Sequence, residues 1–195
     1  MKALIARNES SLPLWHGPAI ASIAIALVVF MLPQSALSVE PPPDGGYPNQ
    51  NTAEGDNALL NVTSGSNNSA IGFEALKRNT TGDSNTAIGC RALLSNGSGG
   101  DDNTAVGFEA LRTNTTGFRN TAIGEWALLS NTGGFDNTAI GSDALLNNRN
   151  GRNNTATGES ALGQNSSGSF NTAAGSGALD SNRTGNNNTA VGLGR

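Results

Sequence analysis

The chain has 195 residues, of which 26 are glycine, 5% are aromatic and 13% are charged, and its formal net charge is −4. So few aromatic residues argue against the broad core of an ordinary globular enzyme, and the low charge density argues against a charge-driven disordered chain. A single cysteine, Cys90, excludes an intrachain disulfide framework and a cysteine-cluster zinc site. The acidic balance and the scattered basic residues exclude a nucleic-acid interface from the expected functions.

The first 38 residues are typical of a secretory signal peptide. Lys2 and Arg7 precede an apolar run over residues 19–32, which is shorter than the about 20 residues that a membrane-spanning helix needs. Small side chains follow this run, so we expect cleavage before Val39. An uncleaved N-terminal anchor is the alternative. Cleavage would also remove His16, the only histidine.

Residues 39–50, VEPPPDGGYPNQ, are expected to form a proline- and glycine-rich linker, because three consecutive prolines favour polyproline II. From residue 51 to residue 195 the sequence repeats with a period of 17, with one step of 18. The common pattern is N-T-A-[IV]-G-x-x-A-L-x-x-N-x-x-G-x-x. We number the repeats 1 to 9 and their positions 1 to 17. The repeats begin at Asn51, Asn68, Asn85, Asn103, Asn120, Asn137, Asn154, Asn171 and Asn188.

Such a short fixed period indicates a solenoid. The N-T-A-[IV]-G stretch predicts a short strand with the Thr and position 4 on one face and the Ala on the other. The N-x-x-G stretch predicts a turn. The A-L segment fits either a second short strand or one helical turn, and we favour two short strands and two turns per repeat. The predicted fold is therefore all-β, a parallel β-solenoid of about eight and a half 17-residue coils.

Stacked coils place like residues in columns about 4.8 Å apart. The asparagine columns could form side-chain amide ladders, or they could serve turn chemistry alone. Each coil offers only one Ile or Val and one or two Leu for its interior, so a single thin coil is expected to be marginal. We therefore expect a homo-oligomer.

The pattern NTAIGxxAL, together with turns such as Asn114–Gly117 (NTTG), resembles the head repeats of trimeric autotransporter adhesins. It also resembles arrays in secreted bacterial and phage-fibre proteins, often upstream of an endosialidase-type chaperone domain. The resemblance covers residues 41–195, in which no anchor, stalk or chaperone domain is recognised. It implies a left-handed β-roll in a homotrimer. It also implies that Ile71, Ile88, Val106, Ile123 and Ile140 point inward. It implies that Ala70, Ala87, Ala105, Ala122 and Ala139 face outward, toward sister chains.

We predict no catalytic, cofactor-binding or metal-binding residues. Asp83, Asp101, Asp102 and Asp136 lie in glycine turns and suggest calcium, but the regular G-G-x-G-x-D array of calcium-binding β-rolls is absent. Four glutamates near positions 6 and 7 are expected to be solvated charges: Glu74, Glu109, Glu125 and Glu159. Cys90 aligns with Phe73 and Phe108 and is expected at an edge. The aromatic residues Phe73, Phe108 and Trp126 are expected to form a modest apolar strip or to pack locally.

The expected function is a non-catalytic, secreted or cell-surface fibre module of the adhesin type, extracellular or associated with an outer membrane. It would present a repetitive Asn/Thr surface to a glycan or protein ligand through many weak contacts. The alternative is a monomeric solenoid that binds ice or glycan surfaces through its Thr and Asn columns, which requires the threonines to face outward. An enzyme is not expected, because no Ser/His/Asp set exists, and neither a small-molecule substrate nor a cofactor is expected. The Thr column of the ice- or glycan-binding alternative consists of Thr86, Thr104, Thr121 and Thr138.

Overall fold

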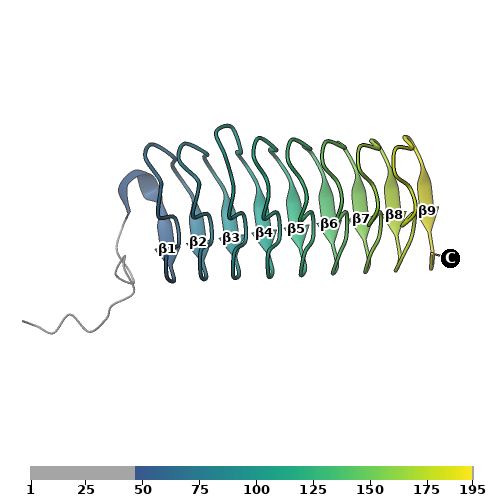
Figure 1. Ribbon diagram of the computed structural model, residues 1–195, viewed down its shortest axis with the longest axis horizontal. Coiled ribbons are helices and arrows are strands. Elements are labelled where there is room, and N and C mark those ends of the chain that lie inside the picture. The colour runs from purple at the N-terminus through teal and green to yellow at the C-terminus, as the bar shows by residue number, and fades with distance from the viewer. Residues whose placement is uncertain (1–46, 195) are drawn as a thin grey trace, which may run out of the picture. The chain divides into compact units, whose positions relative to one another are not determined.

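The computed structural model describes residues 47–194, and these residues form a stack of coils with one short strand per coil (Figure 1). The predicted signal peptide, residues 1–38, lies outside the described residues. The nine strands pair in parallel, and their order in the sheet is their order in the sequence. The prediction of an all-β parallel β-solenoid with 17-residue coils is therefore confirmed. The strands are β1 (Thr52–Glu54), β2 (Ser69–Ile71), β3 (Thr86–Ile88), β4 (Thr104–Val106), β5 (Thr121–Ile123), β6 (Thr138–Ile140), β7 (Thr155–Thr157), β8 (Thr172–Ala174) and β9 (Thr189–Val191).

The register of the sheet follows the repeat without slippage. Ala105 pairs with Ala122, for example, and each Thr or Ser at position 2 pairs with its equivalent in the next coil. The single extra residue of repeat 3 is absorbed in the turn before β4, where Gly99 adopts a φ of 84°. Gly100 then takes the place of the position-15 glycine of the other repeats. Its carbonyl accepts side-chain hydrogen bonds from Asn85 and Asn96, as the equivalent carbonyls do from their own asparagines.

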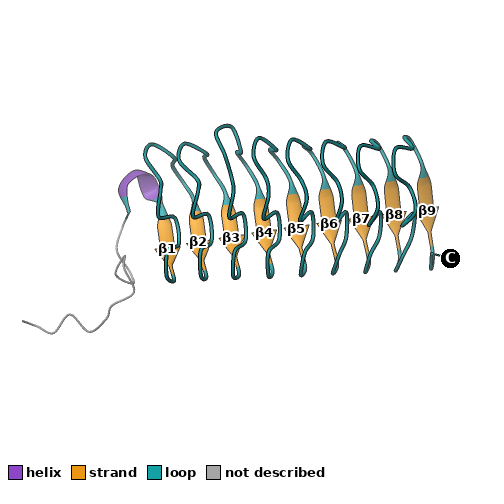
Figure 2. Cartoon of the chain, in the orientation of Figure 1, coloured by secondary structure: helices purple, strands orange, loops and turns teal. Residues whose placement is uncertain are grey.

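The second predicted strand is wrong, because the A-L segment forms a turn in every complete coil (Figure 2). Ala75 and Leu76 are adjacent and both fully buried, whereas a strand would direct them to opposite faces. The leucine achieves this with a left-handed φ of 49° at Leu76. Its N–H still bonds the next coil, reaching the Ala92 carbonyl at 3.0 Å. Tertiary packing and this hydrogen bond offset a backbone conformation that leucine ordinarily avoids.

The predicted orientation of the strand side chains is also wrong, although the alternation itself is right. Ala122 has no exposed surface, whereas Ile123 is 39% exposed and Ile71 is 43% exposed. The reason lies on the opposite wall, where a leucine and two asparagines of every regular coil already fill the interior, leaving room for only a methyl group. Buried alanines are Ala70, Ala87, Ala105, Ala122 and Ala139, and outward-facing residues are Ile71, Ile88, Val106, Ile123 and Ile140.

The predicted amide ladders are present, and they run through the interior. In the position-1 column, Asn120 Nδ2 donates to Asn103 Oδ1 at 3.2 Å and to the Gly134 carbonyl at 2.9 Å. Asn120 Oδ1 in turn accepts from both the backbone N–H and the side chain of Asn137, each at 3.1 Å. In a second column, at position 12, the side chains alone are linked in the same way, for example with Asn131 Nδ2 donating to Asn114 Oδ1 at 2.8 Å. Buried amides are therefore hydrogen-bonded in continuous chains rather than serving only the turns.

The last four residues of the predicted linker, Tyr47–Gln50, lie against the first coil. Pro48–Gln50 form a short 3₁₀ turn, and Tyr47 forms an isolated bridge with Asn51 and packs on the core. Asn51 Nδ2 donates to the Pro48 carbonyl at 2.8 Å. This carbonyl thus takes the place that the asparagine Oδ1 of the preceding coil has in the rest of the ladder. This segment covers the N-terminal end of the solenoid interior.

Candidate functional site

The outer face of the sheet carries two parallel ranks of side chains, one of threonine and one mainly of isoleucine. The isoleucine rank is continuously aliphatic from β2 to β6, and we call these five residues, Ile71, Ile88, Val106, Ile123 and Ile140, the apolar sheet patch. Polar residues border it, with Glu54 on β1 and Thr157 on β7. Beyond Thr157 the rank continues with Ala174 and Val191. The threonine rank is longer than the apolar sheet patch and continues through β9. Bounded apolar surface with a polar rim is typical of interaction sites.

An aromatic strip adjoins the apolar sheet patch at positions 6 and 7. Phe73 and Phe108 are exposed, Cys90 lies half-buried between them in the column, and Trp126 packs edge-on against Phe108 with ring centroids 6.4 Å apart. In the sequence, only the position-5 glycine separates Phe73, Cys90 and Phe108 from the isoleucine rank, whereas Gly124 and Glu125 both separate Trp126 from it. The aromatic strip therefore widens the apolar surface over coils 2 to 5.

Behind the aromatic strip, charged side chains pair between coils. Glu74 contacts Lys77 at 2.7 Å and Arg91 at 3.1 Å, and Arg91 also reaches Glu109 at 3.4 Å. Glu109 further contacts Arg112 at 3.6 Å. The hydrogen bond from Lys77, and then that from Arg91, lowers the pKa of Glu74 below its ordinary value. Glu74 and Glu109 are thus tied to cations in a structural network rather than arranged as an acid/base pair.

Two of the predicted solvated glutamates are thus placed differently from the expectation. Glu74 and Glu109 belong to the network, whereas Glu125 and Glu159 are exposed. The network can be recognised in the sequence only when the repeats are aligned with one another. Arg91 stands one repeat after Glu74 and one repeat before Glu109, and so it contacts both.

Two aspartates of the glycine turns bond backbone groups of neighbouring coils. Asp83 Oδ1 accepts from the Ser66 N–H at 2.7 Å, and Asp101 Oδ1 accepts from the Asp83 N–H at 2.9 Å. Within residues 47–194, no three His, Cys, Asp or Glu side chains come together in a way that could hold a metal ion. Asp83 and Asp101 therefore act as caps between successive turns.

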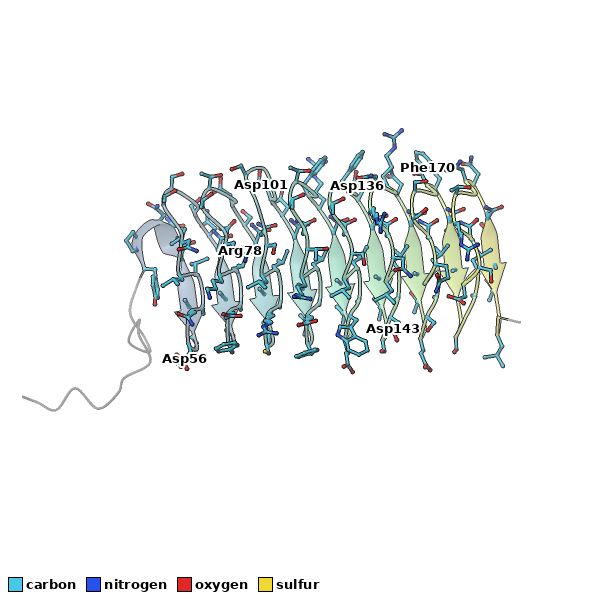
Figure 3. The ribbon with its side chains drawn as sticks, viewed as in Figure 1. Asp56, Arg78, Asp101, Asp136, Asp143 and Phe170 are labelled. Atoms are coloured by element: carbon cyan, nitrogen blue, oxygen red, sulfur yellow. The ribbon has the colours of Figure 1, made fainter. Side chains whose placement is uncertain are left out.

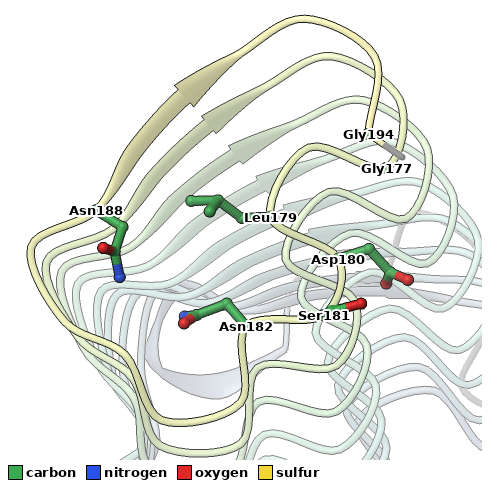
Figure 4. Close-up of a pocket in the computed structure, with 7 residues that line it drawn as sticks. All are labelled: Gly177, Leu179, Asp180, Ser181, Asn182, Asn188 and Gly194. Atoms are coloured by element: carbon green, nitrogen blue, oxygen red, sulfur yellow. The ribbon is translucent and has the colours of Figure 1, made fainter.

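A notch opens at the C-terminal end of the solenoid (Figure 4). Leu179, Asn182 and Asn188 line it, and these are positions that the following coil covers elsewhere in the stack. Asn182 Oδ1 accepts from the N–H of Gly185, a bond from its own turn that takes the place of the bond from the next coil. The notch is the end surface of the described stack, and Asn182 and Asn188 in its lining belong to the ladders.

The chain matches no protein-family model, and no curated protein or solved structure matches it either. Among residues 47–194, no helix has the length and apolar character that crossing a membrane requires. Residues 47–194 offer long, regular surfaces as candidate sites. These surfaces are the outer sheet face with its aromatic strip and, on the far side of the turn glycines, the edge that carries the aspartates.

Proposed function

We propose that the protein is a non-catalytic, secreted or cell-surface fibre module that assembles as a homotrimer through its outer sheet face and serves adhesion or display. The observation that carries this proposal is the apolar sheet patch, a run of five aliphatic side chains on a flat parallel sheet with polar residues at both ends. Burying such a surface removes apolar area from water at about 25 cal/mol per Å². The aromatic strip adds residues of the type enriched in interface cores.

The surface that supports the trimer differs from the one that the family resemblance implied. Ala105 and Ala122 fill the coil interior and are not accessible to a sister chain. Ile88 and Ile123, on the opposite face of the same strands, are accessible. Three parallel rods that turn this face toward a common axis would bury all three patches, which closes the assembly without leaving a free copy of the interface.

Replacing both Ile88 and Ile123 with Glu is expected to convert the trimer to a monomer, because each chain would bring two uncompensated charges into the apolar contact. The mass of residues 39–195 in solution, measured by light scattering or sedimentation, checks this. The matched control is Ser95→Glu with Ser130→Glu, which places the same charges on the same two coils but on another side, and it should leave the trimer intact. A wild-type chain that is monomeric at all accessible concentrations contradicts the trimer.

The secreted or surface location rests on the N-terminal sequence. We expect the mature protein to begin at Val39, which N-terminal sequencing of the exported protein measures directly. Recovery of an intact Met1 on membrane-bound protein would instead support an uncleaved anchor.

A monomeric solenoid that binds ice or a glycan surface is the second candidate. The observation that favours it is the outward orientation of the threonine rank, for example Thr121 and Thr138 on β5 and β6. The asparagine part of this alternative is removed, because both asparagine columns are buried. The threonine rank continues through β9, whereas the apolar sheet patch is confined to β2 to β6. A bounded apolar patch is typical of a protein contact, and for this reason we favour the trimer over this candidate.

A further inference from the structure

The edge formed by positions 13 to 17 of the repeats carries a charge pattern that the proposed trimer does not use. Within the fold, the Asp83 and Asp101 carboxylates accept hydrogen bonds from backbone N–H groups of neighbouring coils. We call this edge the turn edge, and Figure 3 labels Asp101, Asp136 and Phe170 along it, with Asp56 and Asp143 on the opposite edge. Four aspartates and four arginines occupy it, so it is neutral although the whole chain has a net charge of −4. In chain order they are Asp83, Asp101, Asp102, Arg119, Asp136, Arg149, Arg152 and Arg183.

None of these eight side chains takes part in the ion pairs found within residues 47–194, which lie on the other side of the coils. Arg119, Arg149, Arg152 and Arg183 are exposed. Guanidinium groups left without carboxylate partners on an otherwise acidic protein are available to an external anion.

Two stacked phenylalanines mark the centre of the turn edge. The rings of Phe118 and Phe135, from coils 4 and 5, are 4.9 Å apart and inclined by 4°. The Arg119 guanidinium lies over the Phe118 ring at 5.6 Å, and the Arg152 guanidinium lies over the Phe135 ring at 5.5 Å. This stack orients the arginines and forms a half-buried apolar centre of the kind that anchors protein interfaces.

The pattern around this centre is self-complementary. Consider a two-fold axis that lies in the contact plane, perpendicular to the rod, and passes between coils 4 and 5. It places coil 3 of one chain against coil 6 of the other, and coil 4 against coil 5, at equal positions in the repeat. Asp101 then faces Arg152, both at position 16, and Arg119 faces Asp136, both at position 17. Phe118 likewise faces Phe135, and every pair occurs twice.

We propose that the turn edge is a homophilic contact, in which a second copy of this chain binds antiparallel with its coils 3 to 6 against coils 6 to 3. The partner is identified by charge complementarity, because a parallel copy would oppose Asp101 to Asp101 and Arg152 to Arg152. Asp102 and Arg149 lie beside these antiparallel pairs. Asp83, in coil 2, faces coil 7 of the partner, which is one coil away from Arg183 in coil 8. This surface is distinct from the apolar sheet patch, so both contacts can form on the same rod.

The contact is small and therefore reversible. Four coils at about 4.8 Å spacing and an edge on the order of 10 Å wide give roughly 200 Å² per partner, well below the about 800 Å² of a standard interface. The turn edge of one chain is thus expected to bind weakly. The proposed homotrimer carries three turn edges, and association should strengthen steeply when several of them bind at the same time. Since the pairs are exposed, salt should weaken them.

Charge reversal tests both the surface and the orientation. One variant of the full-length mature chain carries Asp101→Arg with Asp136→Arg, and the other carries Arg119→Asp with Arg152→Asp. Each variant alone opposes like charges, and we expect its edge-to-edge association constant to fall at least about tenfold in sedimentation at low salt. An equimolar mixture should recover wild-type association, because all four charge pairs form between unlike partners.

Recovery on mixing cannot come from a folding defect. Orientation is reported by a chain that carries Asp101→Arg with Arg152→Asp, because this exchange keeps unlike charges opposed only when the two copies are antiparallel, and it should associate like wild type where Asp101→Arg alone does not. Arg78→Asp with Asp143→Arg, away from the turn edge, is the matched control and should associate like wild type. Failure of the mixture to recover, or a wild-type chain whose association is insensitive to both variants, overturns the proposal. So does binding of an anionic polysaccharide by the arginine half without any chain–chain association. The mass of the trimer at high salt reports the sheet face separately and should be unchanged by every turn-edge variant.

Discussion

A Gly124→Ala substitution is expected to destabilise the solenoid severely, because the residue lies where two coils touch. Gly124 has a φ of 135°, a backbone conformation that side chains rarely adopt. An added Cβ would lie 2.5 Å from the Gly141 carbonyl oxygen of the next coil. Backbone strain and overpacking together predict a loss of about 2–6 kcal/mol in the free energy of unfolding. Urea denaturation followed by circular dichroism measures it.

Gly133→Ala is the matched control in the neighbouring turn. There an added Cβ would meet only side-chain atoms, the nearest being Asn150 Oδ1 at 3.2 Å. Its effect should stay within about 1 kcal/mol, since alanine also restricts the unfolded chain. Equal stability of both variants would mean that the coils are not stacked as tightly as these distances state.

Replacing Asn120 with Asp is expected to break the position-1 ladder at its middle. The donor Nδ2 becomes an oxygen that faces Asn103 Oδ1 and the Gly134 carbonyl, previously bonded at 3.2 and 2.9 Å. A buried charge without a partner predicts a loss of about 3–5 kcal/mol near neutral pH. Burial raises the pKa of such a carboxyl above its unfolded value, so the loss should be present above the folded pKa and shrink as pH falls through it.

The comparison for this variant is Asn153→Asp, at an exposed position with a left-handed φ of 54° that aspartate also tolerates. Unfolding free energies of the two variants across a pH series separate burial from the mere gain of a charge. A ladder that contributes little would leave Asn120→Asp as stable as its control at every pH.

Much of the fold follows from the repeat period. The spacing of 17 predicts the number of coils and the register, and the alternation along T-A-I places Thr121 and Ile123 on one face. What the strand alone cannot reveal is which face is inside. That depends on how much of the interior Leu128 and the asparagine columns occupy, and this is a property of the whole coil.

The turn around each leucine was missed for a related reason. A left-handed leucine, such as Leu128 with a φ of 51°, is unfavourable on its own, so local propensity argues against it. It is stabilised by a hydrogen bond from its N–H to the Ala144 carbonyl of the next coil and by full burial of its side chain. Both interactions require the stack to exist, and for this reason a single repeat carries no signal for them.

The candidate surfaces were predicted in part. Sequence alone allows either an aromatic strip or local packing at Phe73, Phe108 and Trp126, and in the described structure these residues lie beside the isoleucine rank. The stacked pair Phe118 and Phe135 could have been found from their equal position in adjacent repeats. Aligning the repeats by charge as well as by hydrophobicity is the step that reveals such pairs.

The asparagine ladders also give the rod an electrical direction. In every ladder bond the later asparagine donates and the earlier one accepts, as between Asn137 and Asn120 or between Asn131 and Asn114. Their amide dipoles therefore add head to tail along the axis, as peptide dipoles do in an α-helix, with the positive end toward Asn51 and the negative end toward Asn188. Each in-frame coil added by duplication would lengthen this dipole without reversing it. Length and polarity would then grow together in units of one repeat.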